Sequence, residues 1–114
     1  MVEGIRVVIY PVTDLAQAKT LYRTLLGVEP YMDEAYYVGF RVGDQEIGLD
    51  PNGHHKGMTG PVGYWQVNDI QNSLQLLLEA GAQAQQEVQD VGGGKLIALV
   101  KDTDSNIIGL LQAP

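Results

Sequence analysis

The strongest constraint on the fold of this 114-residue chain is an internal repeat, with a period of about half the chain. The segment Val12-Thr13-Asp14-Leu15 is followed much later by the similar segment Val67-Asn68-Asp69-Ile70. The triplet Ile47-Gly48-Leu49 likewise returns as Ile108-Gly109-Leu110 near the end of the second half. Because matching features occur in the same order in both halves, the sequence predicts two copies of one supersecondary unit.

The first copy begins with a strand and a helix. Residues 6–10 are mostly β-branched or aromatic, which predicts a strand. Asp14 is placed to cap a helix with one apolar face, and Gly27 stands where a left-handed C-cap is expected. Three short strands are predicted to follow near residues 28–32, 36–42 and 45–50, with turns at Asp33-Glu34 and Gly43-Asp44.

The second copy repeats this order. Residues 62–67 predict a strand, Asn68 or Asp69 can cap the next helix, and Gly81 is expected to end it. Three further strands are predicted near residues 82–89, 95–100 and 106–111, separated by Gly92-Gly93-Gly94 and Asp102-Thr103-Asp104-Ser105. The sequence therefore predicts the element order β-α-β-β-β twice.

These patterns predict one α+β domain of residues 1–114 that contains two βαβββ modules in tandem. Module 1 covers about residues 1–52, a link rich in Gly and Pro covers about 51–61, and module 2 covers about 61–114. A four-stranded sheet with one helix leaves its other face uncovered. The two modules are expected to form half-open mixed-sheet barrels around a small-molecule cleft. The alternative is that the uncovered faces pack on each other or on a second subunit.

Composition and charge exclude several classes of function. The chain has no cysteine, which excludes disulfide scaffolds, thiol catalysis and cysteine zinc sites. Fourteen Asp and Glu residues against seven Lys and Arg residues give a net charge of −7, which argues against a nucleic-acid partner. No apolar run approaches the ~18 residues of a membrane span, and residues 1–6 lack a signal-peptide layout. We therefore expect a cytoplasmic protein.

Two motifs resemble the vicinal oxygen chelate superfamily, which contains glyoxalase I, bleomycin-resistance proteins and extradiol dioxygenases. The opening Pro11-Val12-Thr13-Asp14-Leu15, with Leu21-Tyr22 and Leu25-Leu26-Gly27 behind it, is similar to the family's strand–Asp–helix start. The closing segment from Asp102 to Leu110 resembles the family's "DPDGNxIEL" ending. The resemblance covers nearly the whole chain and implies a glyoxalase-like fold.

The resemblance also places four metal-ligand positions of the family on this chain. They fall on Val7, Gly48, Val62 and Gly109. Valine and glycine have no side-chain atom that binds a divalent metal, so no family-type metal site and no cofactor are expected. A shift of two residues along the strands would bring in Glu46, Asp50 or Gln66, which would require a differently placed metal. The resemblance then implies the metal-free bleomycin-resistance branch, which binds its ligand in a groove of an arm-exchanged dimer.

Strand alternation extends these four positions to a candidate ligand-binding set. The set is Val7, Ile9, Tyr37, Phe40, Gly48, Asp50, His54, His55, Val62, Tyr64, Gln66, Lys95, Gly109 and Leu111. Glu46 and Ile107 share the same strand parity, whereas Val8, Gly63, Trp65, Val67, Ile108 and Leu110 are expected to pack under the helices.

Three features of this set have open alternatives. Glycines at positions 48 and 109 either leave room for a flat ligand ring or serve only close packing. His54 and His55 are interpreted as exposed loop residues or as a lid over the cleft, and less readily as a loop metal site with Asp50. Lys95 follows a glycine-rich hairpin and is expected at the mouth of the cleft.

The leading hypothesis is a metal-free protein that binds or sequesters a small organic molecule, aromatic or cationic, such as a metabolite or an antibiotic. The alternative is an enzyme of the same superfamily, a lyase, isomerase or dioxygenase, with a relocated metal or metal-free chemistry. A third hypothesis is a structural or regulatory subunit. A homodimer is expected, because pairing about a twofold axis hides exposed sheet edges and faces.

Overall fold

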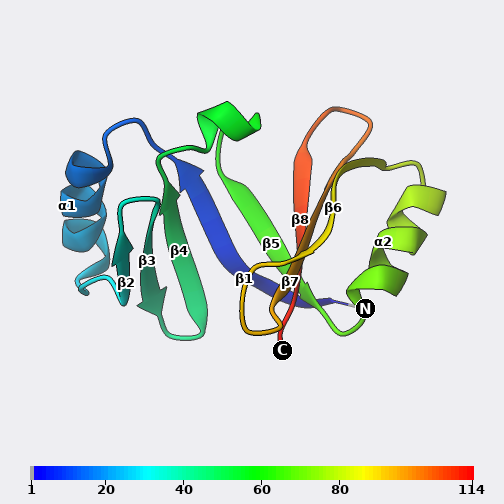
Figure 1. Ribbon diagram of the computed structural model, residues 1–114, viewed down its shortest axis with the longest axis horizontal. Helices are drawn as coiled ribbons and strands as arrows, with labels where there is room; N and C mark the ends of the chain where they lie inside the picture. Colours follow the sequence, from blue (N-terminus) through cyan, green and yellow to red (C-terminus); the bar gives the residue numbers. More distant parts are fainter. Residues whose placement is uncertain (1) are drawn as a thin grey trace. The chain divides into compact units, whose positions relative to one another are not determined.

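The structure, a computed structural model, describes residues 2–114 and shows eight strands and two helices among them, with one short 3₁₀ helix. The first module contains β1 (Val2–Pro11), α1 (Leu15–Leu26), β2 (Met32–Glu34), β3 (Tyr37–Val42) and β4 (Gln45–Asp50) (Figure 1). The 3₁₀ helix η1 (His54–Lys56) follows. The second module contains β5 (Val62–Val67), α2 (Ile70–Glu79), β6 (Gln83–Asp90), β7 (Leu96–Lys101) and β8 (Ile107–Gln112). The predicted α+β fold with two βαβββ modules is confirmed.

The chain divides into two compact units. The N-terminal unit is Arg6–Val62, and the C-terminal unit consists of residues 2–5 together with Gly63–Pro114. Strand β1 therefore contributes its first residues to the C-terminal unit. There Ile5 lies beside Gly63 of β5, where an added Cβ would be 3.5 Å from the Ile5 Cδ1 atom.

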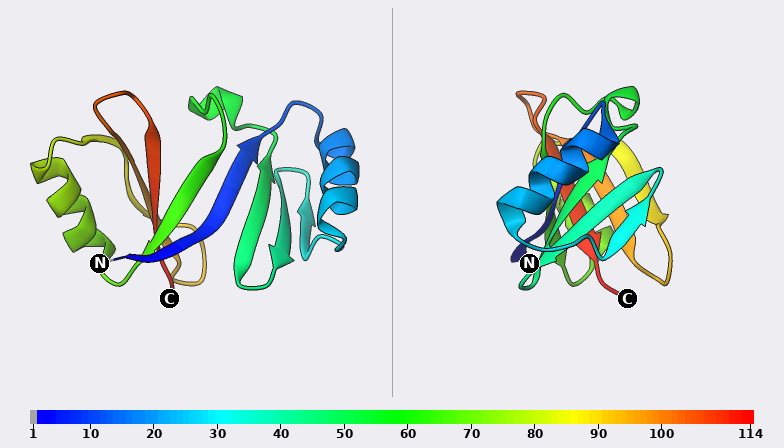
Figure 2. Two further views of the ribbon diagram at one scale, coloured as in Figure 1. Left: turned by 180° about the vertical axis from the view of Figure 1, so that it is seen from behind. Right: turned by 90° about the vertical axis from the view of Figure 1, so that its left-hand side faces the viewer.

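The N-terminal unit has the strand order β2-β3-β4-β1, with β4 antiparallel to β3 and parallel to β1. Helix α1 covers one face of this open sheet (Figure 2). Three fully buried residues form the core beneath the helix: Val38, Phe40 and Leu49. Because side chains alternate along a strand, Tyr37, Gly39 and Arg41 lie on the opposite face, which we call the helix-free face.

The C-terminal unit has the strand order β5-β8-β7-β6, with β8 parallel to β5 and antiparallel to β7. Helix α2 packs on one face of this sheet, over a core of four buried residues: Val67, Ile70, Ala98 and Leu110. Val67 and Leu110 are therefore on the helix side, as strand alternation predicts. Trp65 has the same parity but remains 37% exposed.

Both helices begin at the aspartates that the repeat singles out. The Asp14 side chain accepts a hydrogen bond from the Gln17 N–H, and Asp69 accepts one from the Asn72 N–H. Gly27 ends α1 in the left-handed conformation at φ 71°. Neither helix among residues 2–114 has the length and apolar character needed to cross a bilayer.

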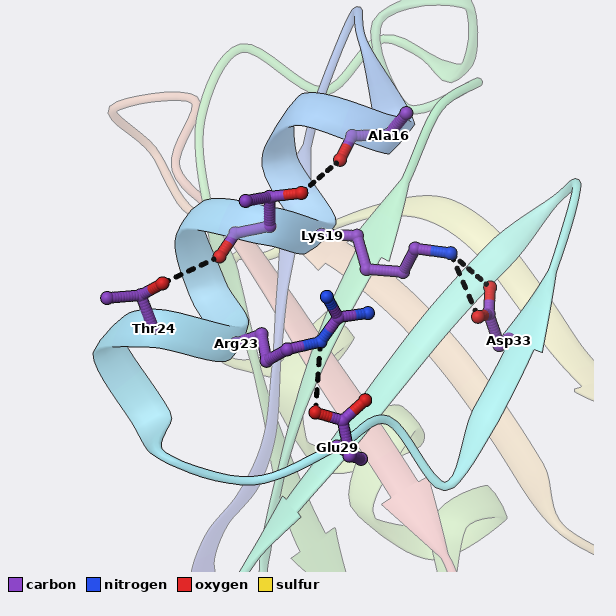
Figure 3. A network of polar contacts seen from close by, with 7 residues as sticks. Ala16, Lys19, Arg23, Thr24, Glu29 and Asp33 are labelled. Atoms are coloured by element: carbon purple, nitrogen blue, oxygen red, sulfur yellow. Dashed lines mark hydrogen bonds and ion pairs between the residues drawn. The ribbon is translucent and has the colours of Figure 1, made fainter.

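The second strand differs from its prediction. Residues 28–32 were expected to be a strand and Asp33-Glu34 a turn, but β2 is Met32–Glu34. Two ion pairs hold this segment against α1, Arg23–Glu29 at 3.1 Å and Lys19–Asp33 at 2.9 Å (Figure 3). The segment therefore reaches β3 only at its end, where the Tyr31 N–H donates to the Gly39 carbonyl.

Candidate functional site

The helix-free face of the N-terminal unit carries a carboxylate held by two tyrosines. The Tyr31 hydroxyl donates to Oε1 of Glu46 at 2.5 Å, and the Tyr37 hydroxyl donates to Oε2 at 2.5 Å. Glu46 lies on β4, Tyr37 lies on β3, and Tyr31 immediately precedes β2. Glu46 and Tyr37 are half-buried, whereas Tyr31 is 44% exposed. We call Glu46, Tyr31 and Tyr37 the carboxylate–phenol cluster.

Arg41 adds a positive charge beside this cluster. It lies opposite Glu46 in the antiparallel register of β3 and β4, and its guanidinium carbon is 4.0 Å from the centroid of the Tyr31 ring. Burial and the hydrogen bond to Glu46 raise the pKa of Tyr31 to about 12, although Arg41 acts in the opposite direction. The phenol therefore stays protonated at neutral pH and keeps its hydrogen for Glu46.

Glycines beneath the tyrosine rings make this packing geometrically feasible. A Cβ on Gly48 would lie 2.7 Å from the Cε1 atom of Tyr37, and a Cβ on Gly39 would lie 2.9 Å from the Cε1 atom of Tyr31. Real Cβ atoms essentially never approach other atoms this closely. Of the two readings of Gly48 left open by the sequence, close packing is the one that the structure supports, because the chain's own ring fills the space.

A similar tyrosine–glycine pair occurs in the C-terminal unit. Tyr64 is paired with Gly109 in the β5–β8 register, and a Cβ on Gly109 would lie 2.6 Å from the Cδ2 atom of Tyr64. Gln66 is paired with Leu111 on the same face. Tyr64 and Leu111 are only 8% and 5% exposed, so this face is mostly apolar and buried.

The loop after β4 holds the two histidines. Asp50 is buried and accepts hydrogen bonds from the Asn52 N–H and from Nζ of Lys56, at 2.8 Å each. His54 and His55 lie between these partners in η1 and are exposed. Asp50 therefore supports the loop conformation, and the histidines are presented to solvent.

The other predicted site residues divide between the two faces and the turns. Val7 and Ile9 lie beside Glu46 and Gly48 in the β1–β4 register, on the helix-free face. Phe40 is instead fully buried in the core beneath α1, because it alternates with Gly39 and Arg41 on β3. Val62 is buried at the start of β5. Lys95 is half-buried in the hairpin before β7, where its N–H donates to the Gly92 carbonyl.

Sequence reasoning missed the importance of two residues at the cluster. Tyr31 lay in the strand predicted at 28–32 and was one of the aromatic residues considered for ligand stacking, but the faces of that strand were not assigned, so nothing linked Tyr31 to Glu46. Arg41 is four residues after Tyr37 on β3, so strand alternation could have predicted that both side chains lie on the same face.

A family model shows to which protein superfamily the chain belongs. The model of the Glyoxalase/Bleomycin resistance protein/Dioxygenase superfamily matches residues 4–110. The chain belongs to this superfamily. The resemblance carried by the Asp14 and Asp102–Leu110 motifs is thereby confirmed. No curated protein sequence matches the chain significantly.

Several solved structures share the fold of this chain. Methylmalonyl-CoA epimerase from Mycobacterium tuberculosis is 20% identical over 99% of this chain and 90% of its own, with a TM-score of 0.73. A superfamily member from Vibrio splendidus 12B01 is 14% identical over 99% of this chain and 100% of its own, with a TM-score of 0.73. A variant of Streptomyces coelicolor methylmalonyl-CoA epimerase in complex with 2-nitronate-propionyl-CoA is 13% identical, covering 99% and 96%, with a TM-score of 0.75.

The residues of this superfamily member do not fit the metal of its metal-dependent relatives. The four positions on which the resemblance places that metal are Val7, Gly48, Val62 and Gly109, none of which offers a side-chain ligand atom. The tyrosine rings over the two glycines leave no room for a carboxylate side chain there. Within residues 2–114, no three His, Asp or Glu side chains are grouped to hold a metal ion.

Proposed function

We propose that the protein binds a small organic cation with an aromatic part, on the helix-free face of its N-terminal unit and without a metal. The observation that carries this proposal is the Glu46 carboxylate, which two tyrosine hydroxyls hold in place at 2.5 Å each. Such a carboxylate is oriented before a ligand arrives, so little ordering remains to oppose binding.

The chemistry of the cluster favours a cation. A carboxylate has about four acceptor sites, and the two tyrosines use only two of them. Tyrosine ring faces attract cations, and the Arg41 guanidinium over Tyr31 shows that this ring face accepts one. The net charge of −7 adds a weak long-range attraction for the same class of ligand.

Binding of benzylammonium, benzyl alcohol and phenylacetate, followed by isothermal titration calorimetry, tests this proposal. We expect benzylammonium to bind in preference to its neutral and anionic analogues. Glu46→Gln should weaken that binding by about 10- to 100-fold, because a charge-assisted hydrogen bond contributes ~1.5–3 kcal/mol. Glu87→Gln, which removes the same charge from an exposed position on β6, is the matched control. Equal binding of all three compounds, or none of any, would contradict the proposal.

A second candidate function is an enzyme of the superfamily that transfers a proton without the usual metal positions. The half-buried Glu46 favours it, because a fixed carboxylate within reach of a bound substrate can act as a general base. The fold shared with methylmalonyl-CoA epimerases makes an epimerase or isomerase the first reaction class to consider.

Deuterium incorporation from heavy water distinguishes this enzyme from a binding protein. Candidate carbon acids would be incubated with the wild-type chain and with Glu46→Gln, and exchange would be followed by NMR. Exchange that depends on Glu46 supports catalysis. Stoichiometric nickel, zinc or iron in freshly purified protein would instead support an enzyme with a relocated metal. Inertness with and without added metal would contradict the second candidate and leave the binding proposal as it stands.

A further inference from the structure

Arg41 already occupies one surface that a cationic ligand would use. Its guanidinium carbon lies 4.0 Å from the centroid of the Tyr31 ring, which is the distance of a stacked cation. The hydroxyl of that same ring donates to Glu46, and Arg41 faces Glu46 across the β3–β4 pair. Arg41 itself is exposed, so solvent surrounds the outer part of its side chain.

We infer that Arg41 is an internal competitor that covers the cation-binding surface of the carboxylate–phenol cluster, and that the cluster prefers a planar guanidinium or amidinium ligand. This inference rests on the proposed function and names the ligand class more narrowly. A ligand guanidinium binds when it takes the place of the Arg41 guanidinium over Tyr31.

The geometry favours a planar cation over a compact ammonium. A guanidinium is flat and weakly hydrated, so it stacks on a phenol ring and donates two parallel hydrogen bonds to a carboxylate. Both oxygens of Glu46 keep a free lone pair after each accepts one tyrosine hydrogen bond. The ring and the carboxylate are therefore presented together, and the chain's own guanidinium shows how the ring is approached.

Because Arg41 is exposed, moving its side chain away from Tyr31 costs little free energy. Arg41 contacts the Tyr31 ring face and also forms a side-chain hydrogen bond with Tyr31. An exposed side chain can leave both contacts for water without leaving a buried charge. Tyr31 keeps two other contacts when Arg41 leaves, because its hydroxyl donates to Glu46 and its N–H donates to the Gly39 carbonyl. The site would then exchange one cation for another without rebuilding the sheet.

Calorimetric titration of benzylguanidinium into variants of the whole chain tests the inference. Arg41→Ala should tighten binding by about two- to fivefold, the factor that corresponds to one exposed cation–π contact. Arg6→Ala is the matched control, because it removes the same charge from an exposed ion pair with Asp44 in the same unit. The gain should disappear in Arg41→Ala combined with Glu46→Gln.

A second measurement in the wild-type chain needs no substitution at Arg41. The Nε–H resonance of Arg41 should shift when benzylguanidinium is added, since the group leaves the ring of Tyr31. Two outcomes would refute the competition by Arg41 while the wild-type protein still binds benzylammonium. In the first, Arg41→Ala binds benzylguanidinium no better than Arg6→Ala does; in the second, the Arg41 resonance does not move. The proposed function would stand in either case. If no variant binds either cation, both are refuted.

Discussion

Tyr37 owes its position to the absence of a side chain at residue 48. The ring lies across Gly48 and Gly39, and its hydroxyl reaches Glu46 from there. The glycines at positions 39 and 48 therefore matter because they leave space for the Tyr37 ring. The same relation holds between Gly109 and Tyr64 in the C-terminal unit.

Gly48→Ala should lower the free energy of unfolding by about 2 kcal/mol, because overpacking a filled site typically costs ~1–3 kcal/mol. The new Cβ would lie 2.7 Å from two atoms of the Tyr37 ring. Urea denaturation measures the loss. Gly60→Ala is the control, since no atom lies within 4 Å of its Cβ position. If Gly48→Ala lowers the free energy of unfolding by the same amount in a Tyr37→Ala background, the clash with the Tyr37 ring is not the cause of the loss.

Tyr31 should titrate late, with a pKa of about 12 against an ordinary value of 10.0. Because the folded-state pKa is raised, the associated stability is fully present below pH 10 and is lost as the pH rises toward 12. Ultraviolet difference titration of the wild type and Tyr31→Phe checks the assignment. Glu46→Gln should lower the pKa of Tyr31, and an unchanged value would contradict the role given to the carboxylate.

Helix ends were predictable from the sequence because the signals are local. Asp14, Asp69 and Gly27 act on backbone groups within four residues of themselves. Strand β5 was also predicted with its observed bounds, 62–67. The position of β2 could not be predicted in this way. A strand of three residues is defined by its pairing with β3, a contact between segments that no local sequence signal specifies.

Asp69→Ala should destabilise the fold by about 1 kcal/mol, the usual effect of losing an N-cap side chain. The Asp69 carboxylate accepts the Asn72 N–H at 3.1 Å at the start of α2. Asp69→Asn retains an acceptor oxygen and should retain most of the stability. Thermal denaturation of the two variants compares them, and equal melting temperatures for Ala and Asp at this position would contradict the capping role.

At the scale of the whole molecule, we expect a homodimer. Each unit has a helix on only one face of an open sheet, and Leu21 and Leu25 of α1 are 58% and 69% exposed. Apolar surface of this kind is commonly covered by association. Light scattering should give twice the chain mass of 12.4 kDa at micromolar concentration. A mass of one chain would contradict this expectation.

The sequence by itself determined the duplicated α+β fold, its helix caps and the lack of side-chain ligand atoms at Val7, Gly48, Val62 and Gly109. These properties follow from residue type, hydrophobic period and local hydrogen bonds, which act over a few residues. Only the tertiary structure decided that Phe40 is a core residue, that Tyr31 joins Glu46, and that tyrosine rings fill the space above Gly48 and Gly109. Those contacts connect residues on different strands, and their geometry exists only after the strands have paired.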